Sequence, residues 1–390
     1  MTKKTKKNNR IINLDTAAGG GNPSSLHHGG AMVKKLVENS RILIASLISG
    51  QPDEIIFTSG GTEANNLAIF GVMGHRMSAG HSMSGSHIIT TKIEHASILE
   101  PCRELARRGC PVTYLPINRD GLVSPVALAE ALRPETVLVS IGYANNEIGV
   151  IQPIRELAKV IRHFRKMRHR MSNILLDIGC LTPYFHTDAC QAPRFLDCRV
   201  STLGVDLMTL NSGKIYGPEG VGCLYVRRGV NLSPLIYGGG QERGIRNGTE
   251  NVKGIVGFAD ALALCVKLRE KESARLTKLR DYFIDRLLKL PGVVLNGSRK
   301  SRLPNNVNVS FIGADSESVV LNLDAQGVYV SSGSACSTHT KDSSYVVQAL
   351  GYQPEAARSA VRFTLDRATT KRDLDYVLKI LPAILKRVML

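Results

Sequence analysis

The chain has 390 residues and is 43% apolar, so it can bury a large core and form one large and one small domain. Its formal net charge is +17, but no RNA-binding motif, zinc finger or aromatic-rich basic strand accompanies that charge, so we expect no direct nucleic-acid binding. No apolar run of about 18 residues occurs, and the basic segment 1–10 lacks the apolar part of a secretory signal, which predicts a cytoplasmic protein with a disordered tail over 1–10 and no membrane contact.

The first part of the chain predicts a strand, a helix and then a strand–turn–helix unit. Residues 11–14 are expected to form a strand, and the apolar spacing over 33–47 is typical of a helix. A buried strand at 54–58 runs through a glycine turn into a helix over 64–71, and 73–86 is expected to be an exposed loop. Such a turn directs backbone N–H groups and the positive end of the helix dipole at one point, which suits a phosphate, although many glycine turns serve only backbone freedom.

Strands and helices alternate from residue 87 onward. We expect strands at 87–92, 112–115, 137–144, 184–186 and 206–210, and helices at 98–108, 126–132 and 154–165. This alternation predicts an α/β domain with a mostly parallel, seven-stranded type of sheet flanked by helices. Polar residues follow the strand ends, where functional residues of such sheets gather, and are expected to converge near Lys214: Glu94, His95, Asn145, Asn146, Glu147, Asp188 and Gln191.

A Gly-rich segment over 238–249 precedes a long helical region to about residue 290 and then a smaller α+β domain. In that domain we expect strands at 307–311, 328–331 and 360–365, and helices at 345–350 and from 371 onward. The large domain is placed at 11–255 and the small domain at 256–390. Whether 11–30 packs with the small domain is left open.

Lys214 follows the strand predicted at 206–210 and precedes a Gly-Pro turn. Apolar surroundings would remove water from its ammonium group, and the neutral amine is the form that Schiff-base chemistry needs. A solvated lysine before a turn is the alternative on this stretch alone.

Ten motifs, in order along the chain, resemble those of the cysteine desulfurases of the NifS and IscS type. These are pyridoxal-phosphate enzymes of fold type I, in class V of the aminotransferase-like group. The motifs are LDTAAG, GNPSSLH, FTSGGTEANNLAI, EHASIL, NNEIGVIQP, HTDACQAP, SGKIYGPEGVG, GGGQERGIRNGTENV, SSGSACS and RFTLDR. The resemblance implies a pyridoxal 5′-phosphate cofactor, a homodimer and a small domain that carries a catalytic cysteine loop.

The resemblance also assigns cofactor contacts. Lys214 would carry the cofactor, Asp188 would pair with its pyridine nitrogen, and His95 would stack on the ring and exchange protons. The further contacts implied are Gln191 and Asn146 at the phenolic oxygen, Gly61 and Thr62 at the phosphate, Asn211 and Ser212 beside the lysine, and Thr249 at the phosphate in the partner subunit. Outside this context, His95 would read as a satisfied strand-end histidine and Asp188 as a turn residue.

Two residues carry the substrate chemistry that the resemblance implies. Arg362 would bind the substrate carboxylate, together with Asn146, because its paired N–H donors match two carboxylate oxygens. Cys336 would attack the substrate sulfur as a thiolate and hold it as a persulfide. Its small polar neighbours favour an exposed loop, and the eight cysteines form no CxxC pair, so neither a metal site nor a disulfide framework is indicated.

The reaction implied is the conversion of L-cysteine to L-alanine, with sulfur passed to an acceptor protein for iron-sulfur cluster assembly or tRNA thiolation. Two other classes stay open: a selenocysteine lyase or other fold-type I lyase, and a weakly catalytic sulfur-relay or RNA-associated protein. Three departures from the family pattern bear on the choice. The segment between Ala18 and Gly21 is short, Gly213 replaces a histidine before the lysine, and Asp366 replaces a glycine after Arg362. The short segment puts the substrate-side contacts in doubt. Gly213 removes one expected phosphate ligand, and Asp366 changes the surroundings of Arg362.

Overall fold

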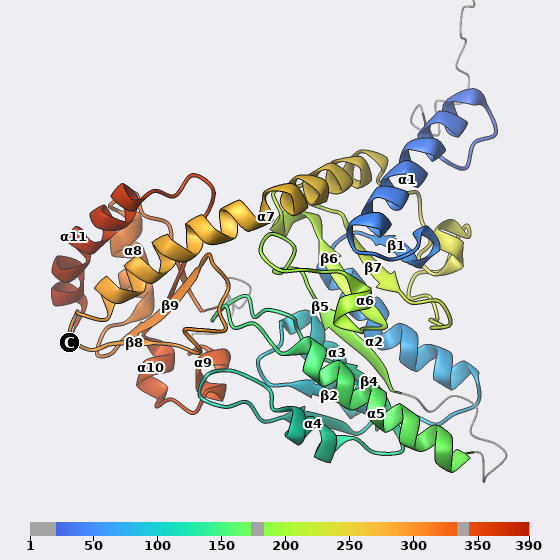
Figure 1. Ribbon diagram of the computed structural model, residues 1–390, viewed down its shortest axis with the longest axis horizontal. Coiled ribbons are helices and arrows are strands. Elements are labelled where there is room, and N and C mark those ends of the chain that lie inside the picture. Colours follow the sequence, from blue (N-terminus) through green and yellow to red (C-terminus); the bar gives the residue numbers. More distant parts are fainter. Residues whose placement is uncertain (1–20, 173–182, 334–342, 390) are drawn as a thin grey trace, which may run out of the picture.

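The computed structural model describes residues 21–172, 183–333 and 343–389. Its larger sheet has seven strands in the order β1-β7-β6-β5-β4-β2-β3 (Figure 1). These strands are β1 (Ile55–Thr58), β2 (His87–Thr91), β3 (Val112–Leu115), β4 (Thr136–Ser140), β5 (Tyr184–Asp188), β6 (Leu207–Asn211) and β7 (Gly222–Val226). The pairs from β3 through β6 are parallel, and only β7 pairs antiparallel with its neighbours β6 and β1.

Helices cover both faces of this sheet. They are α1 (His28–Leu47), α2 (Gly61–Ser78), α3 (Ala96–Arg107), α4 (Pro125–Ala131), α5 (Ile154–Ser172) and α6 (Val200–Leu203). Successive strand residues point to opposite faces, so Ile55 joins the core under α1 and α5 while Ile56 joins the core under α2 and α3. Strands that are buried on both faces consist of nearly continuous apolar residues, which is why their positions could be predicted from the sequence.

A second, antiparallel sheet lies at the other end of the molecule. Its four strands, in the order β10-β11-β9-β8, are β8 (Val293–Leu295), β9 (Asn306–Phe311), β10 (Ser331–Ser332) and β11 (Ala360–Thr364). The accompanying helices are α8 (Ser316–Asp324), α9 (Tyr345–Ala349), α10 (Pro354–Arg358) and α11 (Lys371–Val388). The long helix α7 (Val252–Leu287) runs from the larger sheet to the smaller one (Figure 1).

The predicted architecture is confirmed, with three local corrections. Residues 73–78 are not loop but the end of α2, because Met73 packs into the core under that helix. The strand predicted at 137–144 ends at Ser140. Beyond it, the Gly142 amide donates a hydrogen bond to the Glu94 carboxyl instead of to a neighbouring strand. Of 328–331, only Ser331 is in a strand.

Some expectations are not tested by this structure. The strand at 11–14 and the tail over 1–10 lie outside the described residues. The predicted boundary between 255 and 256 falls in the first turn of α7, and the domain limits stay predictions. Among the described helices, none combines the length and apolar character needed to cross a membrane.

Candidate active site

A pocket of about 210 Å³ lies at the carboxyl ends of β2, β4, β5 and β6, beside the start of α2. Residues from all of these segments line it, as expected for an open α/β sheet. The predicted residues brought together here are Gly61, Thr62, His95, Asn146, Asp188, Gln191, Asn211 and Lys214. Ser212, Thr249 and Arg362 are not in its lining, and Cys336 lies outside the described residues.

Lys214 ends a short 3₁₀ turn, Ser212–Lys214, that directly follows β6. The Asn211 side chain caps this turn by accepting a hydrogen bond from the Gly213 amide at 3.3 Å. Lys214 itself is exposed, so the expectation of apolar surroundings is wrong for the single chain. The turn therefore presents the amine to the pocket without dehydrating it.

The Asp188 carboxylate is fixed by two donors at the end of β5. One oxygen accepts from Asn65 Nδ2 at 2.7 Å and the other from the Cys190 amide at 2.9 Å. Sequence reasoning missed Asn65, although an asparagine among the apolar residues of α2 was a signal that could have been noticed. A carboxylate held in this way presents a fixed negative charge to the pocket.

His95 is the N-cap of α3, and its Nδ1 accepts from the Ser97 amide at 3.1 Å. Since a backbone N–H can only donate, Nδ1 is unprotonated in the neutral ring and the proton lies on Nε2. The Ser97 hydroxyl lies 2.7 Å from the same nitrogen and also accepts from Asn65 Nδ2 at 2.8 Å. Ser97 is a second site residue that sequence reasoning missed.

Glu94 is a buried carboxyl in the pocket wall, and no role was predicted for it. It accepts from the Thr91 hydroxyl at 2.8 Å and from the Gly142 amide at 2.9 Å. Burial raises the pKa of Glu94 to about 8, and the charge of Asp188 acts in the same direction. The Glu94 carboxyl therefore keeps its proton to a higher pH than an ordinary glutamate does.

The start of α2 forms a cradle suited to a phosphate. Gly60 has φ +151°, and a Cβ at Gly61 would lie 2.8 Å from Cys190 Sγ, so only glycine fits there. The first amides of this helix and its dipole favour an anion. Burial raises the pKa of the Cys190 thiol well above its ordinary value, so this cysteine has little thiolate character.

Ser212 and Thr249 lie apart from this lining. Ser212 is buried, and its hydroxyl has no hydrogen-bond partner among the described residues. Thr249 is exposed and lines a separate cavity of about 60 Å³ together with Ser59 and Arg246. The single chain therefore does not bring Thr249 to the Lys214 pocket.

Arg362 reaches the pocket wall from the smaller sheet. It lies on β11, and its Nη1 donates to the Asn146 carbonyl at 2.9 Å. Glu147, which follows Asn146 in the chain but does not line the pocket, is buried and accepts a hydrogen bond from the Ser344 hydroxyl. Burial raises the pKa of Glu147, and the charge of Arg362 opposes that shift.

The described segments before and after Cys336 are therefore both held close to Asn146 and Glu147. On one side, Ser331 pairs with Arg362 across β10 and β11. On the other, Ser344 is bonded to Glu147.

The remaining cysteines and acidic residues do not form another reactive centre in the described part of the chain. Six described cysteines are free and buried: Cys102, Cys110, Cys190, Cys198, Cys223 and Cys265. No group of three or more His, Cys, Asp or Glu side chains within the described ranges is placed to hold a metal ion.

The family model for class-V aminotransferases matches residues 16–377. The chain is 47% identical over 368 residues to the cysteine desulfurase IscS of Dictyoglomus turgidum, covering 94% of this chain and 88% of that one. It is 40% identical over 367 residues to the cysteine desulfurase IscS 1 of Archaeoglobus fulgidus, covering 94% and 90%.

Solved structures agree. A NifS-like protein has a TM-score of 0.83 at 33% identity, covering 94% of this chain and 92% of that one. A NifS-like protein from Rickettsia africae ESF-5 has a TM-score of 0.79 at 29% identity, covering 96% and 94%. With its α/β sheet and strand-end pocket, the chain belongs to the class-V aminotransferase family. Within that family it belongs to the cysteine desulfurases, which confirms the resemblance and the expected enzyme class.

Proposed function

We propose that the Lys214 pocket binds pyridoxal 5′-phosphate and converts L-cysteine to L-alanine, leaving the sulfur as a persulfide on Cys336. The observation that carries the proposal is that Lys214, Asp188, His95 and the start of α2 line one pocket. That donor set fits the cofactor, because it combines an amine, a fixed carboxylate and a phosphate cradle. When bound, the cofactor supplies the electron sink for cleavage next to the substrate amino group.

The side chains divide the work as follows. With the cofactor bound, Asp188 would keep a proton on the ring nitrogen, His95 would contact the ring, and Gly61 and Thr62 would hold the phosphate. Arg362 binds the substrate carboxylate. Further contacts come from Gln191 and Asn146 at the phenolic oxygen, from Asn211 and Ser212 beside the lysine, and from Thr249 across a dimer interface.

Proton and sulfur transfer then fall to two residues. The Lys214 amine takes the Cα proton of the substrate. The Cys336 thiolate attacks the substrate sulfur, so an S–S bond forms, the C–S bond breaks, and its electron pair stays with the carbon. Protonation of that carbon, together with return of a proton to Cα, gives alanine, and an acceptor thiol later removes the sulfur for iron-sulfur cluster assembly or tRNA thiolation.

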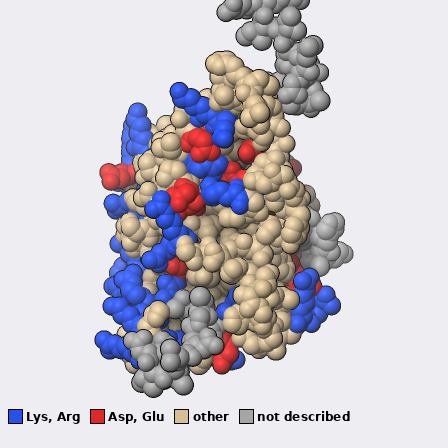
Figure 2. Space-filling view, turned by 90° about the vertical axis from the view of Figure 1, so that its right-hand side faces the viewer, with Lys and Arg blue, Asp and Glu red and all other residues tan. Residues whose placement is uncertain are grey.

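A homodimer is part of the proposal. α1 exposes apolar side chains, among them Met32 and Ile42, which are 58% and 53% exposed. Figure 2 looks at the α1 side of the molecule, where Lys and Arg gather along one edge beside a broad area with few charged side chains. The exposed apolar side chains of α1, on a side of the molecule with a weakly charged area, are suited to a second copy of the chain. Cytoplasmic location is part of the same proposal.

The test is incubation of the purified protein with L-cysteine and a reductant, with alanine and sulfide measured together. We expect both in equal amounts. Absence of alanine would count against the enzyme, and faster turnover of selenocysteine than of cysteine would favour a selenocysteine lyase instead.

A further inference from the structure

Tyr216 lies two residues after Lys214 in a backbone conformation that a tyrosine seldom adopts. Its φ is +64°, in the left-handed region that favours glycine. Such a conformation persists only where the surrounding contacts hold it, and it often marks a functional constraint. The contacts of the Tyr216 side chain hold the residue in this conformation.

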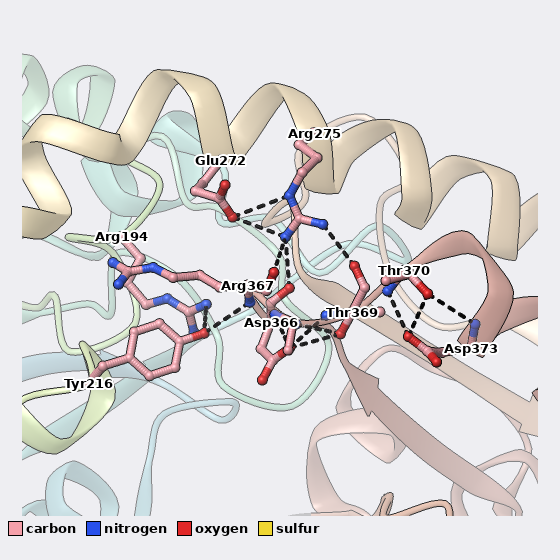
Figure 3. Close-up of polar contacts among 10 residues, drawn as sticks. Arg194, Tyr216, Glu272, Arg275, Asp366, Arg367, Thr369, Thr370 and Asp373 are labelled. Atoms are coloured by element: carbon pink, nitrogen blue, oxygen red, sulfur yellow. Dashed lines mark hydrogen bonds and ion pairs between the residues drawn. The ribbon is translucent and has the colours of Figure 1, made fainter.

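Two guanidinium groups hold the Tyr216 ring. Arg194 lies 4.2 Å and Arg367 4.8 Å from the ring centroid, within the range of cation–π attraction. The phenolic oxygen accepts from an Arg194 Nη and, at 3.4 Å, from the Arg367 amide (Figure 3). The tyrosine thus binds two cations at once, although its residue is 49% exposed.

Each of these three residues is close in sequence to a residue of the proposed active site. Arg194 follows Asp188 in the segment after β5, Tyr216 follows Lys214, and Arg367 follows Arg362. The first two segments belong to the larger sheet and the third to the smaller one. The Tyr216 contacts therefore join the segment that carries the Lys214 amine to the segment that carries Arg362, the residue proposed to bind the substrate carboxylate.

The segment on the Arg367 side is itself held firmly. Asp366 Oδ1 accepts from the amides of Ala368 and Thr369, both at 2.9 Å, so it closes a tight turn. Arg275 of α7 donates to the Thr369 carbonyl at 2.8 Å and to the Asp366 carbonyl at 2.9 Å (Figure 3). The aspartate that replaces a family glycine thus has a local role here, because its side chain closes the turn.

We propose that Tyr216 is a positioning residue that sets the distance between Lys214 and Arg362. The ring and its two guanidiniums fix the Lys214 turn against the 366–369 turn, and β11 carries that placement to Arg362. This inference deepens the proposed function and rests on it. A substrate that must meet an amine with one end and a guanidinium with the other is sensitive to their separation, since a misplacement of about 1 Å can cost about 100-fold in rate.

Like charge makes the ring necessary. Arg194 and Arg367 both lie close to the ring, and their like charges repel each other. The electron-rich ring faces and the phenolic oxygen offset that repulsion. Removing the ring should therefore let the 366–369 turn move away from the Lys214 turn.

The decisive variant is Tyr216→Leu. Its control is Tyr282→Leu, which removes another tyrosine ring that contacts two cationic side chains. Tyr282 lies between Arg286 at 5.5 Å and Lys371 at 4.5 Å, but it joins α7 to α11 and touches neither Lys214 nor Arg362. Both variants are measured as holoenzymes. The readouts are hydrogen exchange over 213–217 and 366–369, equilibrium binding of L-alanine through the cofactor absorbance, and KM and kcat for L-cysteine.

We expect Tyr216→Leu to speed exchange in both segments and to weaken L-alanine binding and kcat/KM on the order of ten- to a hundredfold. Tyr282→Leu should leave L-alanine affinity unchanged even if its Tm falls equally. Equal alanine affinity in the two variants, or unchanged exchange over 366–369 in Tyr216→Leu, overturns the proposal.

Arg367→Gln tests the same contact from the other side if Tyr216→Leu does not fold. It should weaken alanine binding in the same direction, and Tyr216→Phe, which keeps the ring, should weaken it less than either. Unchanged alanine affinity in Arg367→Gln contradicts the proposal. Hydrogen exchange needs no turnover, so a parent protein that makes no alanine from L-cysteine would refute the proposed function while the positioning contact is still measured.

Discussion

His95 is connected to Asp188 through two intervening side chains. Asn65 donates to Asp188 at 2.7 Å and to Ser97 at 2.8 Å, and Ser97 lies 2.7 Å from His95 Nδ1. The residue proposed to act over the cofactor ring and the residue proposed to act at its nitrogen thus share one hydrogen-bond network. Asn65, on α2, is the member that holds both ends in place.

Replacing Asn65 by leucine, whose side chain has the same number of heavy atoms, should loosen Asp188 without opening a large cavity. A hydrogen bond to a charged group is worth about 1.5–3 kcal/mol. Cofactor affinity and kcat/KM should therefore fall on the order of tenfold to a hundredfold, measured by cofactor titration and by alanine production. Asn66→Leu is the control, since within the described ranges the Asn66 side chain donates only to the Thr62 carbonyl of its own helix. Equal effects of the two substitutions would contradict the network.

Gly213→His should tighten cofactor binding. The glycine removes a donor that the family pattern places before the lysine, and a Cβ there would meet only Glu219 Cγ at 3.6 Å and Asn211 Oδ1 at 4.0 Å, so the site accepts a side chain. If the histidine reaches the phosphate, retention on dialysis should improve roughly tenfold to a hundredfold. Unchanged retention would mean that Asn211 or Ser212 already makes that contact.

Glu94 should make the unfolding free energy fall as pH rises. Its folded pKa is about 8, against an ordinary value of 4.5, so between these values the folded chain holds a proton that the unfolded chain has lost. Stability is then lost with a slope of up to about 1.4 kcal/mol per pH unit until the folded group ionises. Urea unfolding across that window should show a flatter profile for Glu94→Gln, whereas Glu130→Gln, on the exposed side of α4, should keep the parent slope. A profile for Glu94→Gln that matches the parent would show that Glu94 ionises normally.

Cys336→Ser should bind cofactor and L-cysteine but accumulate no persulfide and release no sulfide. Neither binding step uses the thiol, whereas sulfur transfer requires it. Cys110→Ala is the control, because Cys110 is buried away from the pocket and its thiol pKa is raised to about 11. Alanine production by the serine variant at the parent rate would replace the persulfide route with direct elimination.

Arg362→Lys should raise KM for L-cysteine more than it lowers kcat. Lysine keeps the charge but lacks the paired donors that match a carboxylate, and it cannot keep the Asn146 carbonyl in the same geometry. The same variant should retain cofactor, because Arg362 is not in the pocket lining. Loss of cofactor together with substrate affinity would assign Arg362 to cofactor binding instead.

Strand-end residues such as Asp188 and His95 could be predicted from the sequence because apolar runs located the strands, and parallel strands bring their carboxyl ends together. Asn65 and Ser97 were missed because their role depends on where α2 and α3 meet the sheet, which no local pattern records. For Lys214 the stretch alone left apolar surroundings and a solvated lysine open, and the structure has the residue exposed at the end of a short 3₁₀ turn after β6.

Tertiary packing explains the other differences. The stretch 73–78 looked like a loop because small and polar residues follow it, yet the burial of Met73 extends α2 through it. Asp366 looked like a disturbance of the Arg362 segment, and only the structure reveals the turn that it closes. The role proposed for Thr249 depends on a second chain.

The helix α7 is 36 residues long, which corresponds to about 54 Å. Its first half contributes Phe258 and Leu262 to the core of the larger sheet, and its second half contributes Phe283 and Leu287 to the core of the smaller one. Unfolding of either core would remove the packing that keeps half of this helix formed. The other half would then lose its helical support, which would destabilise the other core. The two sheets should consequently unfold in one calorimetric transition, with a van't Hoff enthalpy equal to the calorimetric value.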